Sequence, residues 1–429
     1  MKKIKLTALE RSWILYDIGN SAFILLVSTL IPIYFNDLAT TGGLNESLYL
    51  SYWGYAGSVS TLLVAVIGPI CGTLADHRGF KKPIFMACML LGVLGCAAMG
   101  VTAGWLAFLV VFVLAKVGYS SSLVFYDAML PEVTTDERMD TVSSMGYAYG
   151  YIGSVIPFIL CLLLVLFGGK IGIGAGTAMV VSFLITAVWW FVCTQPLLKR
   201  YRQTAFVEHG GNPVSSTFRR LRDTFREVRQ QKHIFLYLLA FFFFIDGVYT
   251  IIDMATAYGT ALGLDTTGLL LALLLTQFVA FPCSIAFGRF SAKYDTGLLI
   301  KICILCYTGI TLFAVFLVSQ WQFWVLAVLV GMFQGGIQAL SRSYLGKIIP
   351  AERSGEYFGL MDICGKGASF LGTTLIAMVS QLTDGRSFHV FGLELQNENI
   401  AVGTLVVIFA IGFVLFCKAD KLNKQYIHI

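Results

Sequence analysis

Runs of apolar residues alternate with short polar segments along the whole chain. Each run has about the 20 residues that a helix needs to cross the hydrocarbon layer of a bilayer. The pattern predicts an all-α membrane protein with twelve transmembrane helices, over residues 12–38, 51–75, 83–101, 104–130, 143–167, 172–193, 234–258, 268–288, 297–318, 321–345, 356–380 and 400–417. A polar segment follows the sixth run, so we expect two six-helix bundles, 1–193 and 234–429, joined by a linker at 194–233.

The positive charges predict the orientation of these helices. Of the 30 Lys and Arg residues, only Lys170 and Arg386 lie in the connecting segments of one side, and Lys116 and Lys366 lie within spans. The others lie in the segments of the opposite side or at the span ends next to them, as Lys301 and Arg342 do, and they are most numerous in the amino-terminal segment and the linker. Because cytoplasmic segments carry the excess of Lys and Arg, we expect both termini in the cytoplasm.

The composition excludes a soluble protein. With 57% hydrophobic and 13% charged residues, the chain has too much apolar surface for an aqueous fold. The net charge of +6 follows from the sorting of cations toward the headgroups of the inner leaflet, so it gives no reason to expect a nucleic-acid partner. We expect a monomeric, integral multi-pass protein among the lipids of a bacterial plasma membrane, with its basic start retained as a signal anchor.

The central linker contains one helical pattern. Phe218, Leu221, Phe225 and Val228 recur at helical spacing, and arginines occupy much of the rest. This pattern predicts an amphipathic helix on the inner leaflet, and a solvated basic linker with little order is the alternative.

Cysteine and histidine residues give no sign of a cofactor. All ten cysteines lie in or at the edges of spans, and the five histidines lie in loops or at the ends of the chain. Cys303 and Cys306 form a CxxC pattern, but they lie in an apolar helix with no histidine nearby in sequence. We therefore expect no disulfide, no metal site and no cofactor.

Small residues predict close contacts between helices. The GxxxG pattern occurs at Gly68/Gly72, Gly146/Gly150, Gly331/Gly335 and Gly355/Gly359. Without side chains, helix backbones can approach closely, and packing of this kind drives helix association in lipid. We interpret these glycines as packing residues.

Polar residues within the spans are candidates for a transport site. A charge at mid-membrane costs roughly 2.5–3.5 kcal/mol on insertion, so each such residue needs a partner or a function. We expect a water-accessible cavity between the two halves, in which Lys116 faces an anionic group of a substrate and Asp246 binds a coupling proton or cation. The predicted substrate-binding residues are Asp17, Asn20, Lys116, Ser120, Asp246, Tyr249, Asp253, Gln334 and Gln338.

Other polar residues within the spans favour gating or purely structural contacts. Asp127 lies near the inner end of its span, and Arg342 ends a polar stripe that begins at Gln334. Asp362 and Lys366 are one helical turn apart, a spacing that favours an ion pair within one helix over a ligand site. We predict gating roles for Asp127, Arg342, Asp362 and Lys366, with mutual neutralisation of charges as the structural alternative.

Several stretches resemble known transporters. The segment 72–82 (GTLADHRGFKK) resembles the loop motif of the major facilitator superfamily. Other stretches resemble the branch of that superfamily that contains bacterial "unknown major facilitator" proteins and fungal autophagy-related vacuolar amino-acid effluxers. These stretches are WILYDIGNSAF (13–23), PIYF (32–35), VSSMGYAYGYIG (142–153), DGVYTII (246–252) and QALSRS (338–343).

The resemblance implies the major facilitator fold, alternating access and a substrate site formed by spans one, four, seven and ten. It also implies a gating latch that comprises Asp76, Arg78, Gly79 and Lys82. We therefore expect a secondary transporter for a small polar or amphipathic metabolite, such as an amino acid or a related compound, with protons as a candidate coupling ion.

Three other functions are weighed against this hypothesis. An aromatic share of 14% and the run of Phe at 241–244 favour a lipid or hydrophobic-drug exporter. A non-transporting receptor is disfavoured because only a short tail follows residue 417. An intramembrane enzyme is disfavoured because no histidine lies at depth. Gly365-Lys366 is followed by Gly367, which excludes an ATP-binding P-loop there.

Overall fold

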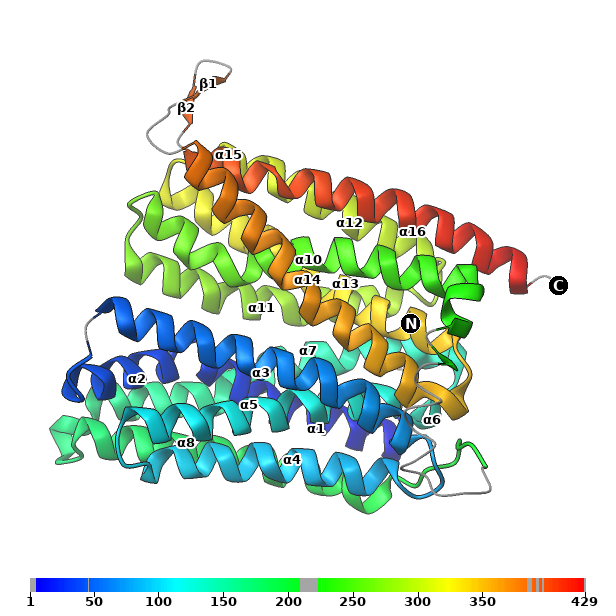
Figure 1. The fold of residues 1–429 in the computed structure, drawn as a ribbon, viewed down its shortest axis with the longest axis horizontal. Coiled ribbons are helices and arrows are strands. Elements are labelled where there is room, and N and C mark those ends of the chain that lie inside the picture. Colours follow the sequence, from blue (N-terminus) through cyan, green and yellow to red (C-terminus); the bar gives the residue numbers. More distant parts are fainter. Residues whose placement is uncertain are drawn as a thin grey trace. The chain divides into compact units, whose positions relative to one another are not determined.

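The computed structural model describes residues 5–44, 46–208, 223–224, 226–383, 388–390, 393–395 and 397–427. Within these ranges the chain is almost entirely helical (Figure 1). Twelve helical stretches among the described residues are long and apolar enough to cross a membrane, which confirms the predicted number. Much of the predicted amphipathic helix falls on residues 218–222 and 225, outside the described residues.

The contacts of the chain divide it into two compact units. Unit 1 comprises Met1–Thr135, Tyr149–Arg219 and Pro350–Gly359, and unit 2 comprises Asp136–Ala148, Arg220–Ile349 and Leu360–Ile429. Each unit therefore includes a short piece from the other half of the sequence. The domain limits predicted at 193 and 234 stay a prediction.

Unit 1 is built from the first eight helices, except for residues Asp136–Ala148, which belong to unit 2. These helices are α1 (Ala8–Val27), α2 (Leu30–Thr41), α3 (Glu46–Ala75), α4 (Lys81–Ala98), α5 (Trp105–Ala128), α6 (Leu130–Val133), α7 (Asp136–Phe167) and α8 (Ala175–Arg200), with 3-10 turns at Met99–Val101 and Gly168–Ile171. Helix α4 packs against α5 and α8, α1 packs against α8, and α3 packs against α5. Buried aromatic rings fill the space between α1 and α5, where Trp13 stacks on Tyr126 with ring centroids 4.2 Å apart.

The first span is not one continuous helix as the hydrophobic run predicted. Helix α1 ends at Val27 and α2 begins at Leu30, with Thr29 between them at φ −131° and ψ −75°. Pro32 explains the break, because it has no N–H to donate to the carbonyl of Ser28 and its ring would clash with that carbonyl. The prediction of an unbroken helix over 12–38 was therefore wrong in this detail.

Unit 2 is built from the later helices. They are α10 (Lys232–Ala261), α11 (Thr266–Phe290), α12 (Thr296–Val315), α13 (Gln320–Ile348), α14 (Ser354–Leu382), α15 (Asn397–Gly403) and α16 (Leu405–Ile427), with a short antiparallel hairpin of β1 (Phe388–Val390) and β2 (Leu393–Leu395). The 3-10 turn at Ala351–Arg353, which precedes α14, belongs to unit 1. Helix α10 packs against α16, α11 against α13, and α12 against both α13 and α16. The start of α14 belongs to unit 1 and its remainder to unit 2.

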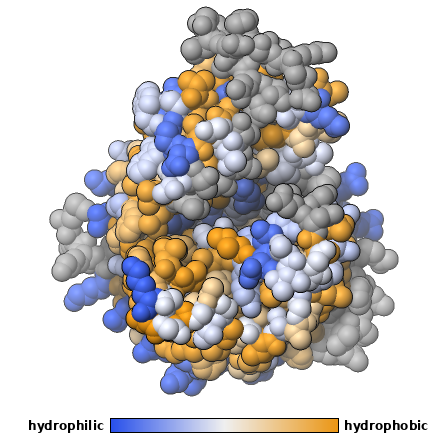
Figure 2. Space-filling model, turned by 90° about the vertical axis from the view of Figure 1, so that its left-hand side faces the viewer, coloured by the Kyte–Doolittle hydropathy of each residue, from blue (hydrophilic) through white to orange (hydrophobic). Residues whose placement is uncertain are grey.

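The outer surfaces of both units are strongly apolar. Leu62 and Leu94 in unit 1 are 68% and 63% exposed, and Leu305 in unit 2 is 53% exposed. Figure 2 shows hydrophobic side chains over much of the visible surface. In water such a surface would be unfavourable, whereas in a bilayer these side chains contact acyl chains.

Candidate functional site

Lys116 is the polar residue at mid-span in unit 1. It lies on α5, is partly exposed, and its ammonium lies 5.9 Å from the centre of the Phe112 ring. Phe112 in turn stacks on Trp53 of α3 at 4.6 Å between ring centroids. On α3, an added Cβ on Gly57 would lie 3.9 Å from the Lys116 ammonium. A cation beside aromatic faces is suited to an anionic or amphipathic ligand.

The other predicted substrate residues of unit 1 lie on α1 and α5. Asp17 is buried against α7, where an added Cβ on Gly150 would lie 3.6 Å from its carboxyl carbon. Asn20 is buried and donates a hydrogen bond to the Tyr16 carbonyl in its own helix. Ser120, one turn from Lys116, is partly exposed. Asn20 therefore has a structural contact, while Ser120 lies on the same helix face as Lys116.

Asp246 is a fully buried carboxylate in the middle of a span of unit 2. It lies on α10, and its Oδ1 accepts a hydrogen bond of 2.9 Å from the backbone N–H of Gly372 on α14. A Cβ on Gly372 would lie 2.3 Å from Thr250 Oγ1 and 3.1 Å from both carboxylate oxygens. Glycine is thus required for α14 to approach Asp246 and Thr250 so closely.

The remaining predicted substrate residues of unit 2 differ in exposure. Gln334 is buried and Gln338 is partly exposed on α13. Tyr249 lies near Gly365 of α14, with a ring carbon 3.7 Å from the position of an added Cβ. Asp253 is exposed. The structure thus brings Tyr249 and Asp246 toward the same helix, α14.

Asp362 and Lys366 form the ion pair that their spacing predicted. Both side chains lie on α14 and are about one-fifth exposed. The pair confirms the structural interpretation of these two residues. Their predicted gating role stays a prediction.

Arg342 binds the beginning of α7 within unit 2. Its Nε donates to Ser143 Oγ and its NH2 group to the Ser143 carbonyl, each at 2.9 Å. Its guanidinium also lies 4.5 Å from the centre of the Tyr147 ring. Beside it, Asp140 accepts hydrogen bonds from Thr296, Ser343 and Lys347. Asp140 was not among the predicted site residues, although it lies in the polar first turns of a long apolar helix.

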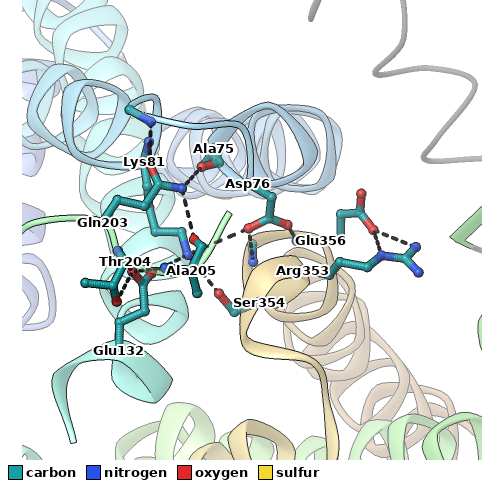
Figure 3. A network of polar contacts seen from close by, with 12 residues as sticks. Ala75, Asp76, Lys81, Glu132, Gln203, Thr204, Ala205, Arg353, Ser354 and Glu356 are labelled. Atoms are coloured by element: carbon teal, nitrogen blue, oxygen red, sulfur yellow. Dashed lines mark hydrogen bonds and ion pairs between the residues drawn. The ribbon is translucent and has the colours of Figure 1, made fainter. Parts of the chain in front are cut away.

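The Asp76 network is the densest group of buried polar contacts in unit 1 (Figure 3). Asp76 follows the last residue of α3 and is fully buried. Its Oδ1 accepts the backbone N–H of Gly355 at 2.8 Å, and its Oδ2 accepts that of Glu356 at 2.9 Å. The first N–H groups of a helix have no partner within the helix and carry its positive dipole end. The Asp76 carboxyl group therefore accepts hydrogen bonds from the first turn of α14.

Lys81 joins Asp76 to the rest of this network. Its ammonium lies 3.7 Å from Asp76 Oδ1 and 2.7 Å from Glu132 Oε1, and it donates to Ser354 Oγ at 2.9 Å. The side chains of Lys81 and Asp76 are 0% exposed and that of Glu132 is 1% exposed. A buried ion pair of this kind is favourable only with further hydrogen bonds. Glu132 receives several of them from residues after α8.

The structure places a different cation of this motif beside Asp76, and the predicted gating roles of Arg78, Gly79 and Lys82 stay a prediction. Arg78 is exposed and stacks on Phe206 at 5.3 Å, and Lys82 is partly exposed. The cation beside Asp76 is Lys81, because it begins α4 and its side chain enters the buried space between α3, α6 and α14. Gly79 adopts φ +80°, a left-handed conformation that favours glycine and closes the turn.

Two of the GxxxG patterns face one another beside this network. A Cβ on Gly72 of α3 would lie 2.3 Å from the carbonyl oxygen of Gly355 on α14. One turn further, a Cβ on Gly359 would lie 3.1 Å from the carbonyl oxygen of Gly68. The two backbones therefore touch, which confirms that these glycines are packing residues.

We expect the attachment of α14 at Asp76 to strengthen as the pH falls. Burial raises the pKa of Asp76 from 3.8 to about 7, more than Lys81 and the two backbone N–H groups lower it, and the Glu356 carboxylate raises it further. Detached and in water, the carboxyl group would titrate near its ordinary value. The attached form therefore binds a proton more tightly, and lowering the pH from about 7 toward 4 favours it.

The charged surroundings of Asp76 are contributed by several elements. Glu132 of α6 shares Lys81 with it, Arg353 pairs with Glu356 at 2.9 Å, and His77 is its buried neighbour in the chain. The measurement is hydrogen exchange at Gly355 and Glu356, corrected for intrinsic exchange, between pH 5 and 8. Asp76→Asn should remove the pH dependence of exchange that remains after this correction. Equal protection at both ends of that range would contradict the expectation.

The chain resembles known proteins over most of its length. The family model described as "Vacuole effluxer Atg22 like" matches residues 43–420. The uncharacterized MFS-type transporter YxiO of Bacillus subtilis (strain 168) is 38% identical over 416 residues, covering 96% of this chain and 94% of that protein. Autophagy-related protein 22-1 of Penicillium rubens is 27% identical over 271 residues, which cover 57% of this chain but only 45% of the fungal protein.

Solved structures share the fold. The transporter FucP in its outward conformation has a TM-score of 0.70 at 15% identity, covering 96% of this chain and 97% of that one. The human organic anion transporter MFSD10 has a TM-score of 0.66 at 15% identity, covering 95% and 98%. At such identity the likeness concerns the fold alone. The relatives and structural neighbours are transporters rather than enzymes.

Proposed function

Because the chain belongs to the Atg22-like family of the major facilitator superfamily and is a secondary transporter, we propose that it moves a small polar or amphipathic metabolite by alternating access. An amino acid or a related compound is the proposed substrate class, and protons are the proposed coupling ion. We propose further that it works as a monomer in a bacterial plasma membrane with both termini in the cytoplasm. The relative from Bacillus subtilis and the sorting of cations support this placement.

One observation carries the proposal: each unit keeps an ionisable side chain in the middle of a span. Lys116 in unit 1 lies partly exposed beside aromatic rings, and Asp246 in unit 2 is buried and accepts a hydrogen bond from the backbone N–H of Gly372. Charged groups at such depth are costly and usually mark substrate or ion pathways. Lys116 would bind the anionic group of the substrate, and Asp246 would take up and release the proton.

The Asp76 network supplies a candidate gate for this cycle. Helix α14 begins in unit 1, where Asp76 binds its first turn, and continues in unit 2. Any movement of one unit against the other must therefore bend α14 or detach it from Asp76. We propose that detachment accompanies the change of access.

Substrate recognition by Lys116 is tested by transport into proteoliposomes. With a pH gradient imposed, a screen over amino acids and other metabolites should identify a transported compound. Lys116→Ala should then raise its KM at least about tenfold, because a charge-assisted hydrogen bond contributes roughly 1.5–3 kcal/mol. Lys170→Ala is the matched control, since Lys170 is exposed outside the long helices. An unchanged KM in Lys116→Ala, or transport restricted to lipids, would refute the assignment.

A further inference from the structure

The segment that follows α8 is bound into the Asp76 network. We call residues 201–207 the linker strap. They follow the end of α8 within the central linker and lie against the α3–α4 connection. Gln203 contacts both ends of that connection. Its Oε1 accepts the backbone N–H of Gly79 at 2.9 Å and that of Lys81 at 3.4 Å, and its Nε2 donates to the Ala75 carbonyl at 3.0 Å.

These contacts match the hydrogen-bonding needs of the two helices. Ala75 is the last residue of α3 and Lys81 the first of α4, so their carbonyl and N–H groups lack partners within their own helices. An amide side chain carries one acceptor and two donors, which is what such a pair of helix ends requires. Gln203 therefore caps the end of one helix and the start of the next.

Glu132 anchors the same strap from the other side. Its Oε2 accepts the backbone N–H groups of Thr204 at 2.6 Å and Ala205 at 3.0 Å, and its Oε1 accepts the Tyr201 hydroxyl at 2.8 Å. Burial and the neighbouring carboxylate raise the pKa of Tyr201, so its hydroxyl keeps its proton and remains a donor. Beyond Gln203, the Val207 N–H donates to the Asp76 carbonyl at 2.9 Å.

We propose that the linker strap positions Asp76 for its contact with the first turn of α14, and that Gln203 is the key residue of the strap. The contacts of Gln203 fix residues 76–80 in the one shape that aims the Asp76 carboxylate at the first turn of α14 (Figure 3). The conformation of the central linker then sets how firmly α14 is attached. The role in transport rests on the proposed function, whereas the effect on α14 does not.

The test is residue-resolved hydrogen exchange on the full-length protein in nanodiscs. Gln203→Ala should speed exchange at Gly79 and Val207, and also about tenfold at Gly355 and Glu356, which Gln203 does not touch. Gln203→Glu keeps the acceptor but sets a carboxylate oxygen against the Ala75 carbonyl, so it should change exchange in the same direction. Gln195→Ala is the control, because Gln195 bonds only a carbonyl of its own helix.

Two outcomes would overturn the proposal. Faster exchange at Gly79 and Val207 with unchanged exchange at Gly355 and Glu356 would make the strap a local feature. Unchanged exchange everywhere would show that Gln203 positions nothing. Gln203→Glu keeps an acceptor for Gly79 but loses the bond to the Ala75 carbonyl, so it gives the same readout if the alanine variant does not fold.

Transport assays separate this inference from the proposed function. Gln203→Ala should change the maximal rate of transport but leave KM within about twofold of the wild-type value, because the strap does not belong to the proposed substrate site. If the wild-type protein transports none of the tested metabolites, the proposed function fails. The exchange results at Gly355 and Glu356 still decide the role of the strap.

Discussion

Replacing Glu132 with alanine should destabilise unit 1 by roughly 3–5 kcal/mol, the cost of removing one partner of a buried ion pair. The variant leaves the fully buried Lys81 ammonium with Asp76, 3.7 Å away, as its remaining carboxylate. It also removes the acceptor of the strap N–H groups at Thr204 and Ala205. The measurement is unfolding of the purified protein in mixed micelles, followed by tryptophan fluorescence and circular dichroism.

A double-mutant cycle isolates the ion pair from the other contacts. Glu132→Gln, Lys81→Met and the double variant should show a coupling free energy, because the two side chains are in direct contact. Glu352→Gln is the matched control, since Glu352 is an exposed glutamate in the 3-10 turn before α14. If Glu132→Ala is no more destabilising than Glu352→Gln, the buried pair contributes little to stability and the latch must depend on the backbone contacts of Asp76.

The sequence predicted the spans because the relevant physics is local. The length of an apolar run is set by the thickness of the bilayer that the helix must cross. Similarly, one turn of helix brings Asp362 and Lys366 together whatever surrounds them. The glycine pairs were likewise visible as a repeated spacing. The break at Thr29 was also encoded locally, in Pro32, and the hydrophobic pattern alone concealed it.

The partners of Asp76 were beyond such reasoning because they come from distant parts of the chain. Lys81 was one of several cations within a few residues of Asp76, and only the packing of α3, α6 and α14 decides which of them is buried. Glu132 and Gln203 lie 51 and 122 residues from Lys81. A signal did exist at Glu132, an acidic residue next to Pro131 directly after an apolar run. No spacing rule, however, connects Gln203 with the motif.

Replacing Asp246 with asparagine should uncouple transport from the pH gradient. For one proton per substrate, a gradient of one pH unit supports about a tenfold concentration ratio of substrate, because 1.4 kcal/mol corresponds to a factor of ten. Asparagine retains an oxygen that can accept the Gly372 N–H, so the contact with α14 is kept while the ionisable group is lost. The ratio in proteoliposomes should therefore fall to one, while exchange of substrate across the membrane continues.

Gly372→Ala separates the charge of Asp246 from its contact with α14. The added Cβ would lie 2.3 Å from Thr250 Oγ1 and must displace α14, yet the carboxyl group remains able to bind a proton. We therefore expect slower transport with the concentration ratio preserved. Asp37→Asn is the control for the loss of a carboxylate, because Asp37 is exposed on α2. A ratio that stays near tenfold in Asp246→Asn would show that another group carries the proton.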